Sequence, residues 1–475
     1  MTDWSRASLT DTAEAIAAGK TTARDVVEAC LDRIGRLGGT VNCFIEVDRD
    51  GARAAADAAD AAQRGGARLG PLHGVPVAHK DMYYRAGRVS ACGSKLRTDW
   101  KPAETATVLK RFDAAGAIEI GRLAMVEFAM GPHGYNPNYP QCRNPWNPDY
   151  IPSGSSSGSG VAVGSRFVHA ALGSDTGGSI RCPANVSGVV GLMPTSGRVS
   201  RHGAMPMSHS CDVVGPLARS ARDCARLLGV LAGADLADST AFDLAVPDYE
   251  AALDSERPLP VIGLARGYFD RNVHPQVARA HDQAAADLRR AGFTVEEVAM
   301  PADLLDEIAE LHPLVIKAEG MANHLPTLRA REEDYTFEVG HRLHAGAFIP
   351  AASYIRALKL RGPYLRAFAQ AAFARTDVIL APVIPIPVPT IAETTGRTGK
   401  AYLDMVVALT RNTKVVNYLG LPALGVPCGF TSNGLPTAFQ LIGRPFDEAT
   451  LLRAAHRYQQ VTDWHSREPA LVSGA

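Results

Sequence analysis

The segment best suited to chemistry places a serine after two glycines, in Gly173-Ser174-Asp175-Thr176-Gly177-Gly178-Ser179. Adjacent glycines let the backbone turn sharply, so that consecutive N–H groups converge on one point and form an anion nest. A nest beside a serine nucleophile suits the oxyanion of an acyl-transfer reaction. The alternative for this segment is a helix N-terminus at which Ser179 acts as a cap residue.

A serine nucleophile needs a base, and Lys80 is one candidate. It ends the apolar run 75–78 after one intervening histidine. Burial there would disfavour the ammonium form and lower the pKa of the lysine toward neutrality, leaving an amine that can accept a proton. The alternative is an ordinary surface lysine after a strand.

A run of small residues, Gly154-Ser155-Ser156-Ser157-Gly158, supplies further hydroxyls. It could be a hydrolase elbow with Ser156 as nucleophile, although the neighbouring serines weaken that match. It could also be a flexible linker. The apolar segments 161–163 and 167–173 follow at once, and a linker would not lie next to such core-like sequence. We therefore expect packed backbone with inward-facing hydroxyls.

Together the three segments resemble the amidase signature family. The separations are 75 residues from Lys80 to Ser155 and 24 residues from Ser155 to Ser179, and these are similar to the family's spacing. Further matching stretches extend the resemblance over nearly the whole chain: 121–131, 143–146, 190–195, 421–424, 434–436 and 440–443. Ser153 and Ser157 stand where the family usually has glycines, which relatives tolerate.

The resemblance implies a Ser-Ser-Lys triad in which Lys80 is the neutral base, Ser155 the relay and Ser179 the nucleophile. A hydroxyl both donates and accepts, so Ser155 can pass a proton in either direction. An acyl-enzyme would form on Ser179 and be hydrolysed by water through the same relay, with no cofactor and no metal. The oxyanion would lie among the backbone N–H groups of Thr176, Gly177, Gly178 and Ser179.

The resemblance also assigns supporting roles. Asp175 and Arg181 would pair and hold the nucleophile loop. Four residues would line the acyl pocket, or alternatively pack in the core: Phe128, Met130, Gly131 and Tyr135.

Within the family we expect a stand-alone amidase that hydrolyses an amide or carbamate. The alternative is the glutamine-hydrolysing A subunit of a transfer-RNA-dependent amidotransferase. That subunit usually carries a Phe-Asp-Gly-x-Arg-Tyr-Gly stretch, which residues 328–337 lack. A further alternative is a non-catalytic binding protein on the same fold, against which the intact Lys80, Ser155 and Ser179 argue. A nucleotide-binding enzyme would need a P-loop or a Gly-x-Gly-x-x-Gly helix start, and neither is present.

Charge and composition restrict the partners. Lys+Arg and Asp+Glu both total 49, so the net charge is zero, which argues against a dedicated nucleic-acid or anionic-membrane binder. No secretory signal, membrane span or metal-ligand spacing is recognisable. We expect a cytoplasmic protein with eight reduced cysteines, a small-molecule amide or carbamate substrate, no nucleic acid, no membrane, and possible homodimerisation.

These residues need a scaffold, and short apolar strands alternate with helices along the chain. We expect strands near 75–78, 117–120 and 377–381, with helices at 104–115, 221–232, 278–291 and 353–374. The alternation predicts an α/β fold with a central mixed β-sheet covered by helices on both faces. Residues 1–65 are expected to form a helical region packed on the core, and 66–475 one large α/β domain.

Overall fold

The computed structural model describes residues 3–474. Within them one mixed sheet has the strand order β1-β3-β2-β4-β6-β5-β10-β11-β9-β7-β8. The strands are β1 (Phe44–Val47), β2 (Pro76–Lys80), β3 (Ile118–Leu123), β4 (Ala170–Asp175), β5 (Val190–Met193), β6 (Val213–Ala218), β7 (Ile262–Arg266), β8 (Val295–Ala299), β9 (Val378–Pro382), β10 (Ala423–Phe430) and β11 (Pro436–Ile442). The predicted α/β class is confirmed.

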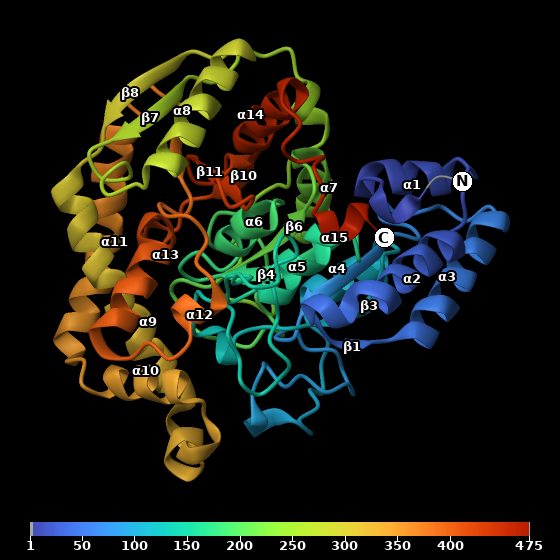
Figure 1. The fold of residues 1–475 in the computed structure, drawn as a ribbon, viewed down its shortest axis with the longest axis horizontal. Coiled ribbons are helices and arrows are strands. Elements are labelled where there is room, and N and C mark those ends of the chain that lie inside the picture. The colour runs from blue at the N-terminus through green and yellow to red at the C-terminus, as the bar shows by residue number, and fades with distance from the viewer. Residues whose placement is uncertain (1–2, 475) are drawn as a thin grey trace.

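Helices surround this sheet, with α1 to α3 at one end of the molecule and α9, α10, α11 and α13 at the other (Figure 1). Their bounds are α1 (Leu9–Ala17), α2 (Ala23–Val41), α3 (Arg49–Arg64), α4 (Thr107–Ala114), α5 (Ser157–Gly164), α6 (Arg181–Ser187), α7 (Ala221–Leu231), α8 (Pro275–Arg290), α9 (Ala302–Ala330), α10 (Phe337–Ala347), α11 (Ala351–Ala372), α12 (Ile391–Thr394), α13 (Gly399–Leu419), α14 (Glu448–Val461) and α15 (Ala470–Ser473).

Strand β9 shows why both faces of the sheet are covered. Successive side chains of a strand point to opposite faces. Val378 and Leu380 belong to the hydrophobic cluster that includes residues of α8 and α14. Ile379 and Ala381 belong to the cluster that includes residues of α9, α11 and α13. An apolar run without polar alternation is typical of a strand buried on both faces.

The N-terminal region is helical, as expected, but it also supplies an edge strand. The Thr22 side chain accepts from the Asp25 N–H and caps α2. Strand β1 was not anticipated; it pairs antiparallel with β3. The region therefore contributes to the same sheet as the rest of the chain, and the boundary at 65/66 stays a prediction.

Three elements bring the chemical residues together. Strand β2 pairs in parallel with β4, so the carboxyl ends of both strands meet at one edge of the sheet. Lys80 is the last residue of β2, and Asp175 is the last residue of β4. Ser155 lies in the loop that enters α5. Strand pairing thus brings Lys80 and Asp175, which are 95 residues apart in the sequence, to the same edge of the sheet.

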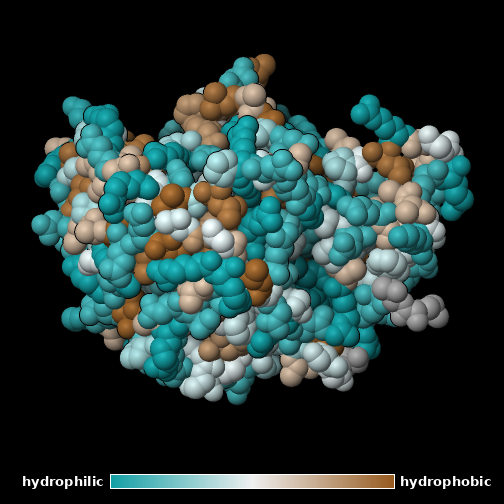
Figure 2. Space-filling view, turned by 90° about the horizontal axis from the view of Figure 1, so that it is seen from above, coloured by the Kyte–Doolittle hydropathy of each residue, from teal (hydrophilic) through white to brown (hydrophobic). Residues whose placement is uncertain are grey.

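Much of the exterior is hydrophilic, with hydrophobic residues in small groups on the face in Figure 2. No helix among residues 3–474 is long and apolar enough to cross a membrane. All eight cysteines are buried and unpaired.

Candidate active site

Lys80 is fully buried, and its Nζ lies 2.7 Å from Ser155 Oγ and 2.8 Å from Ser174 Oγ. Neither neighbour is charged. Burial lowers the pKa of Lys80 to about 7 from its ordinary 10.5, although the charges of Asp212 and Asp175 work in the opposite direction. The adjacent carboxylate of Asp81 pairs with Arg122 instead. A large fraction of Lys80 is therefore a neutral amine near pH 7.

Ser155 and Ser156 differ in their surroundings, although both are fully buried. The peptide bond between Gly154 and Ser155 is cis. The Ser156 hydroxyl donates to the Ser174 carbonyl at 3.2 Å and accepts from the Ser174 N–H at 3.2 Å. Ser156 is thus tied to the backbone of β4, whereas Ser155 contacts the lysine. This geometry does not support an elbow with Ser156 as nucleophile.

Ser179 is only partly buried and lines a cavity of about 520 Å³. Its hydroxyl forms no hydrogen bond with any described residue, so the Lys80–Ser155 contact is present and a Ser155–Ser179 contact is not. Catalytic hydrogen bonds are often long before substrate binds.

Gly178, the residue before Ser179, has φ +129°, and a Cβ there would lie 2.4 Å from Thr413 Oγ1. Glycine is therefore required at the turn that presents Ser179.

The expected anion nest is only partly free. The Gly178 N–H donates to Asp175 Oδ1 at 2.6 Å, so the expectation that it faces an oxyanion is not met in this geometry. The N–H groups of Thr176, Gly177 and Ser179 donate to nothing in the part of the chain that the structure describes. These three N–H groups remain as donors to an oxyanion.

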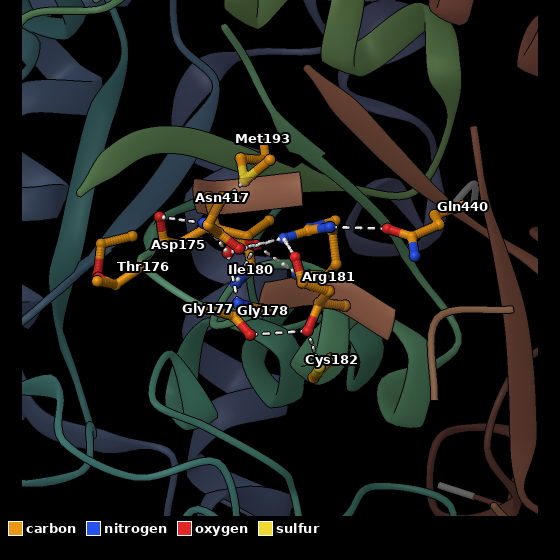
Figure 3. A network of polar contacts seen from close by, with 12 residues as sticks. Asp175, Thr176, Gly177, Gly178, Ile180, Arg181, Cys182, Met193, Asn417 and Gln440 are labelled. Carbon is orange, nitrogen blue, oxygen red and sulfur yellow. Dashed lines mark hydrogen bonds and ion pairs between the residues drawn. The ribbon is translucent and has the colours of Figure 1, made fainter. Parts of the chain in front are cut away.

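Asp175 and Arg181 contact each other behind the loop, and both side chains are fully buried. Arg181 Nε lies 3.0 Å from Asp175 Oδ2, and its Nη atoms donate to Gln440 at 2.7 Å and Asn417 at 2.6 Å (Figure 3). Burial alone would raise the pKa of Asp175, but Arg181 and the hydrogen bonds around the carboxylate hold it below its ordinary value.

The same carboxylate also fixes the backbone. It accepts from the N–H groups of Gly178, Ile180 and Arg181. The Asn417 amide adds a bond to Asp175 Oδ1 at 2.9 Å. One buried acid therefore holds both ends of the nucleophile turn. Sequence reasoning missed Asn417 and Gln440, which lie more than 230 residues further along the chain.

Of the four residues expected to line the acyl pocket, the structure places two at the cavity. Met130 and Gly131 line the cavity beside Ser179, whereas Phe128 and Tyr135 are not among its lining residues. Phe128 is buried and stacks edge-on against His324, with ring centroids 4.4 Å apart. Phe128 therefore packs in the core, which was the alternative for this group.

Other cavity residues were not anticipated, because they come from α9, α10 and α13. His312 Nε2 lies 2.8 Å from the Thr176 carbonyl, and burial lowers the pKa of this histidine to about 4. Lys317, Arg342 and Lys414 line the same cavity. Nothing in the local sequence of these helices signals that they line the cavity, since this depends on tertiary packing.

The described residues contain no group of three or more His, Cys, Asp or Glu side chains placed to hold a metal ion.

The chain is similar to known proteins over most of its length. A sequence model of the amidase family matches residues 25–452. The A subunit of the glutamyl-tRNA(Gln) amidotransferase of Roseiflexus sp. (strain RS-1) is 40% identical, over 98% of each chain. A chain from a vestigial protein complex that reveals the origins of an s-triazine catabolic enzyme is 34% identical, with a TM-score of 0.89 over 96% of this chain and 98% of that one. The native peptide amidase from Stenotrophomonas maltophilia is 31% identical, with a TM-score of 0.83 over 97% and 98%.

These findings correct the expected partners. The Roseiflexus relative is named as one component of an enzyme that acts on glutamyl-tRNA(Gln). That contradicts the expectation that the partner is a small-molecule substrate alone, with no nucleic acid. The exclusion of nucleic acid rested on a net charge of zero. One component of such an assembly needs no basic surface of its own, because its partners can carry the nucleic-acid contacts.

The family model spans most of the chain, and the relatives match it almost from end to end. The solved structures share its fold at TM-scores well above the level of chance likeness. This chain is an enzyme that belongs to the amidase family, the amidase-signature hydrolases of carbon–nitrogen bonds.

Proposed function

We propose that this chain releases ammonia from the side-chain amide of glutamine, as the A subunit of a glutamyl-tRNA(Gln) amidotransferase. The observation that carries the chemistry is the buried contact between Lys80 Nζ and Ser155 Oγ, next to the loop that bears Ser179. The relative at 40% identity over 98% of both chains supports the choice of substrate and assembly.

In the proposed reaction, Ser179 Oγ attacks the amide carbonyl while its proton passes to Ser155 Oγ. Ser155 passes its own proton to the neutral amine of Lys80. The oxyanion accepts hydrogen bonds from the free N–H groups of Thr176, Gly177 and Ser179. The protons return along the same path to the leaving nitrogen, and ammonia departs from an acyl-enzyme. Water, deprotonated by the same relay, then releases the acid.

Ser174 has a supporting part in this scheme. A neutral lysine amine has two N–H donors and one lone pair. Two hydroxyls lie within 2.8 Å of Nζ, so one N–H can be held by Ser174 while the lone pair faces Ser155. Ser174 thereby orients the amine as a positioning residue.

A second candidate is a hydrolase that acts alone on an apolar amide. Two observations favour it. The cavity beside Ser179 has aliphatic walls, which include Ile316, Leu403 and Val406. Residues 328–337 also lack the Phe-Asp-Gly-x-Arg-Tyr-Gly stretch that is usual in the glutamine-hydrolysing component of the amidotransferase.

One experiment separates the two candidates. The purified chain is given glutamine, asparagine and aliphatic amides, and ammonia release is measured, with Ser179→Ala as control. We expect glutamine to be the best substrate and a glutamyl adduct on the wild-type chain by intact-protein mass. Assembly is tested by exchanging this chain for its relative in the reconstituted Roseiflexus enzyme and measuring glutaminyl-tRNA. A strong preference for aliphatic amides with no glutaminyl-tRNA would establish the second candidate instead.

A further inference from the structure

The cavity beside Ser179 contains an excess of positive charge. Its lining includes four cationic side chains and one carboxylate, that of Glu338, histidines aside. The cationic residues are Lys317, Arg342, Arg397 and Lys414. The whole chain has a net charge of zero, so the excess is a local property of this cavity.

Three of these cations are partly buried and come from three different helices. Lys317 lies on α9, Arg342 on α10 and Lys414 on α13. Lys414 is beside the nucleophile loop, since its Cβ would lie 3.9 Å from a Cβ built on Gly177. Arg342 lies over the Tyr402 ring, 5.4 Å from its centroid. All three line the cavity that contains Ser179.

None of the three has a carboxylate within 4.0 Å anywhere in residues 3–474, and neither lysine ammonium group donates a hydrogen bond to those residues. Burial lowers the pKa of both lysines. Arg342 lowers the pKa of Lys317 further. Arg411 lowers the pKa of Lys414 further, and Glu310 offsets part of that shift. Each of these effects records an ammonium that is less well stabilised here than in water.

The aliphatic walls increase the influence of these charges. Apolar side chains keep the dielectric constant low, so a cavity with an excess of one sign of charge attracts the opposite sign strongly. Partly buried cations that repel one another gain most from an anion that contacts several of them. A neutral aliphatic group in the same place would add no negative charge to balance the excess of cations.

We propose that the substrate carries a carboxylate at the end of a short aliphatic chain, and that Lys317, Arg342 and Lys414 bind it while Ser179 attacks the amide. This inference rests on the proposed function, because it needs an amide to be hydrolysed at Ser179. It adds the feature that selects the substrate and the residues that recognise it. Met130 and Ile316, which line the cavity, would contact the methylene groups between the two ends.

The test compares three primary amides of similar size. Glutaramate ends in a carboxylate, 5-methylhexanamide ends in an isopropyl group of the same shape, and 5-aminopentanamide ends in an ammonium group. We expect kcat/KM for glutaramate to exceed that for 5-methylhexanamide by about 100-fold at low salt, with the cationic amide poorest. Raising the salt concentration should reduce the ratio, because the interaction is between charges.

Single substitutions show which residues cause the preference for glutaramate over 5-methylhexanamide. Lys317→Met, Arg342→Met and Lys414→Met should each reduce the glutaramate preference about tenfold, mainly by raising KM. Lys359→Met removes an exposed lysine of α11 outside the cavity and serves as the matched control, with no change in the ratio. Lys414→Glu should reverse the order, so that 5-aminopentanamide becomes better than glutaramate.

Binding can also be measured without turnover. Glutarate, which has no amide, should bind the Ser179→Ala protein by calorimetry, and Lys414→Met should weaken that binding about tenfold. Equal kcat/KM for glutaramate and 5-methylhexanamide, together with no glutarate binding, would overturn the inference while the amide hydrolysis stands. No hydrolysis of any amide and no adduct on Ser179 would instead overturn the proposed function.

Discussion

The ionisation of Lys80 can be tested by replacing it with methionine, an apolar side chain of similar length. In the unfolded chain this lysine keeps its proton up to about pH 10.5, whereas in the folded protein it loses the proton near pH 7. Folding therefore releases a proton between these two pH values, and stability must rise with pH through that window.

The size of the effect follows from the two pKa values. Each pH unit corresponds to about 1.4 kcal/mol, so burying Lys80 costs about 4 kcal/mol at pH 7 and about 2 kcal/mol at pH 9. The wild type should therefore gain about 2 kcal/mol relative to Lys80→Met when the pH is raised from 7 to 9. Taking the difference between the two proteins removes the contribution of every other titrating group.

The assay is urea-induced unfolding at pH 7, 8 and 9, followed by tryptophan fluorescence, with exposed Lys359→Met as control. In parallel, kcat/KM of the wild type should increase about tenfold per pH unit below 7 and level off above 8. A difference in stability between wild type and Lys80→Met that stays constant from pH 7 to 9, with a rate that still rises at pH 10, would refute the neutral-amine argument.

Three further predictions concern the loop and its neighbours. Asp175→Asn and Arg181→Met should each cost on the order of 3–5 kcal/mol of stability, and the double variant clearly less than the sum; additive losses in thermal unfolding would contradict the coupling. Ser155→Ala should slow phosphonylation of Ser179 by a fluorophosphonate by about 100- to 10,000-fold, whereas Ser156→Ala should lose about 1 kcal/mol of stability and remain reactive. Gly178→Ala should lose about 1–3 kcal/mol of stability and most of its activity, since φ is +129° there; a fully active variant would refute the steric argument.

The sequence was sufficient for those parts of the fold that depend on local pattern. The apolar run 75–78 became β2, and the helix expected at 353–374 became α11. Two long helices were missed, α9 and α13. Helix α9 contains Pro313 and Pro326, which normally indicate a break, and it continues because tertiary packing outweighs local preference.

In the candidate site, too, residues in distinctive local sequence could be predicted, whereas residues brought in by tertiary packing could not. Lys80, Ser155 and Ser179 could be named from motif spacing, because all three lie on segments whose sequence is itself unusual. The cations of α9, α10 and α13 could not, since an exposed lysine and a cavity lysine look alike in a helical sequence. Phe128 shows what motif position alone leaves open: the sequence allowed either the pocket or the core, and its ring packs against His324.

The buried cysteines have a practical consequence. Burial raises the pKa of all eight thiols, so none is a thiolate at neutral pH while the fold is intact. A maleimide or disulfide reagent can then react only when a segment opens. The rate at which each cysteine is modified then reports how readily its segment opens, and mass spectrometry can measure this rate without any substrate. Because Cys182 lies on α6 and Cys30 on α2, one experiment would measure separately the opening of the helix after the nucleophile loop and that of the N-terminal helices.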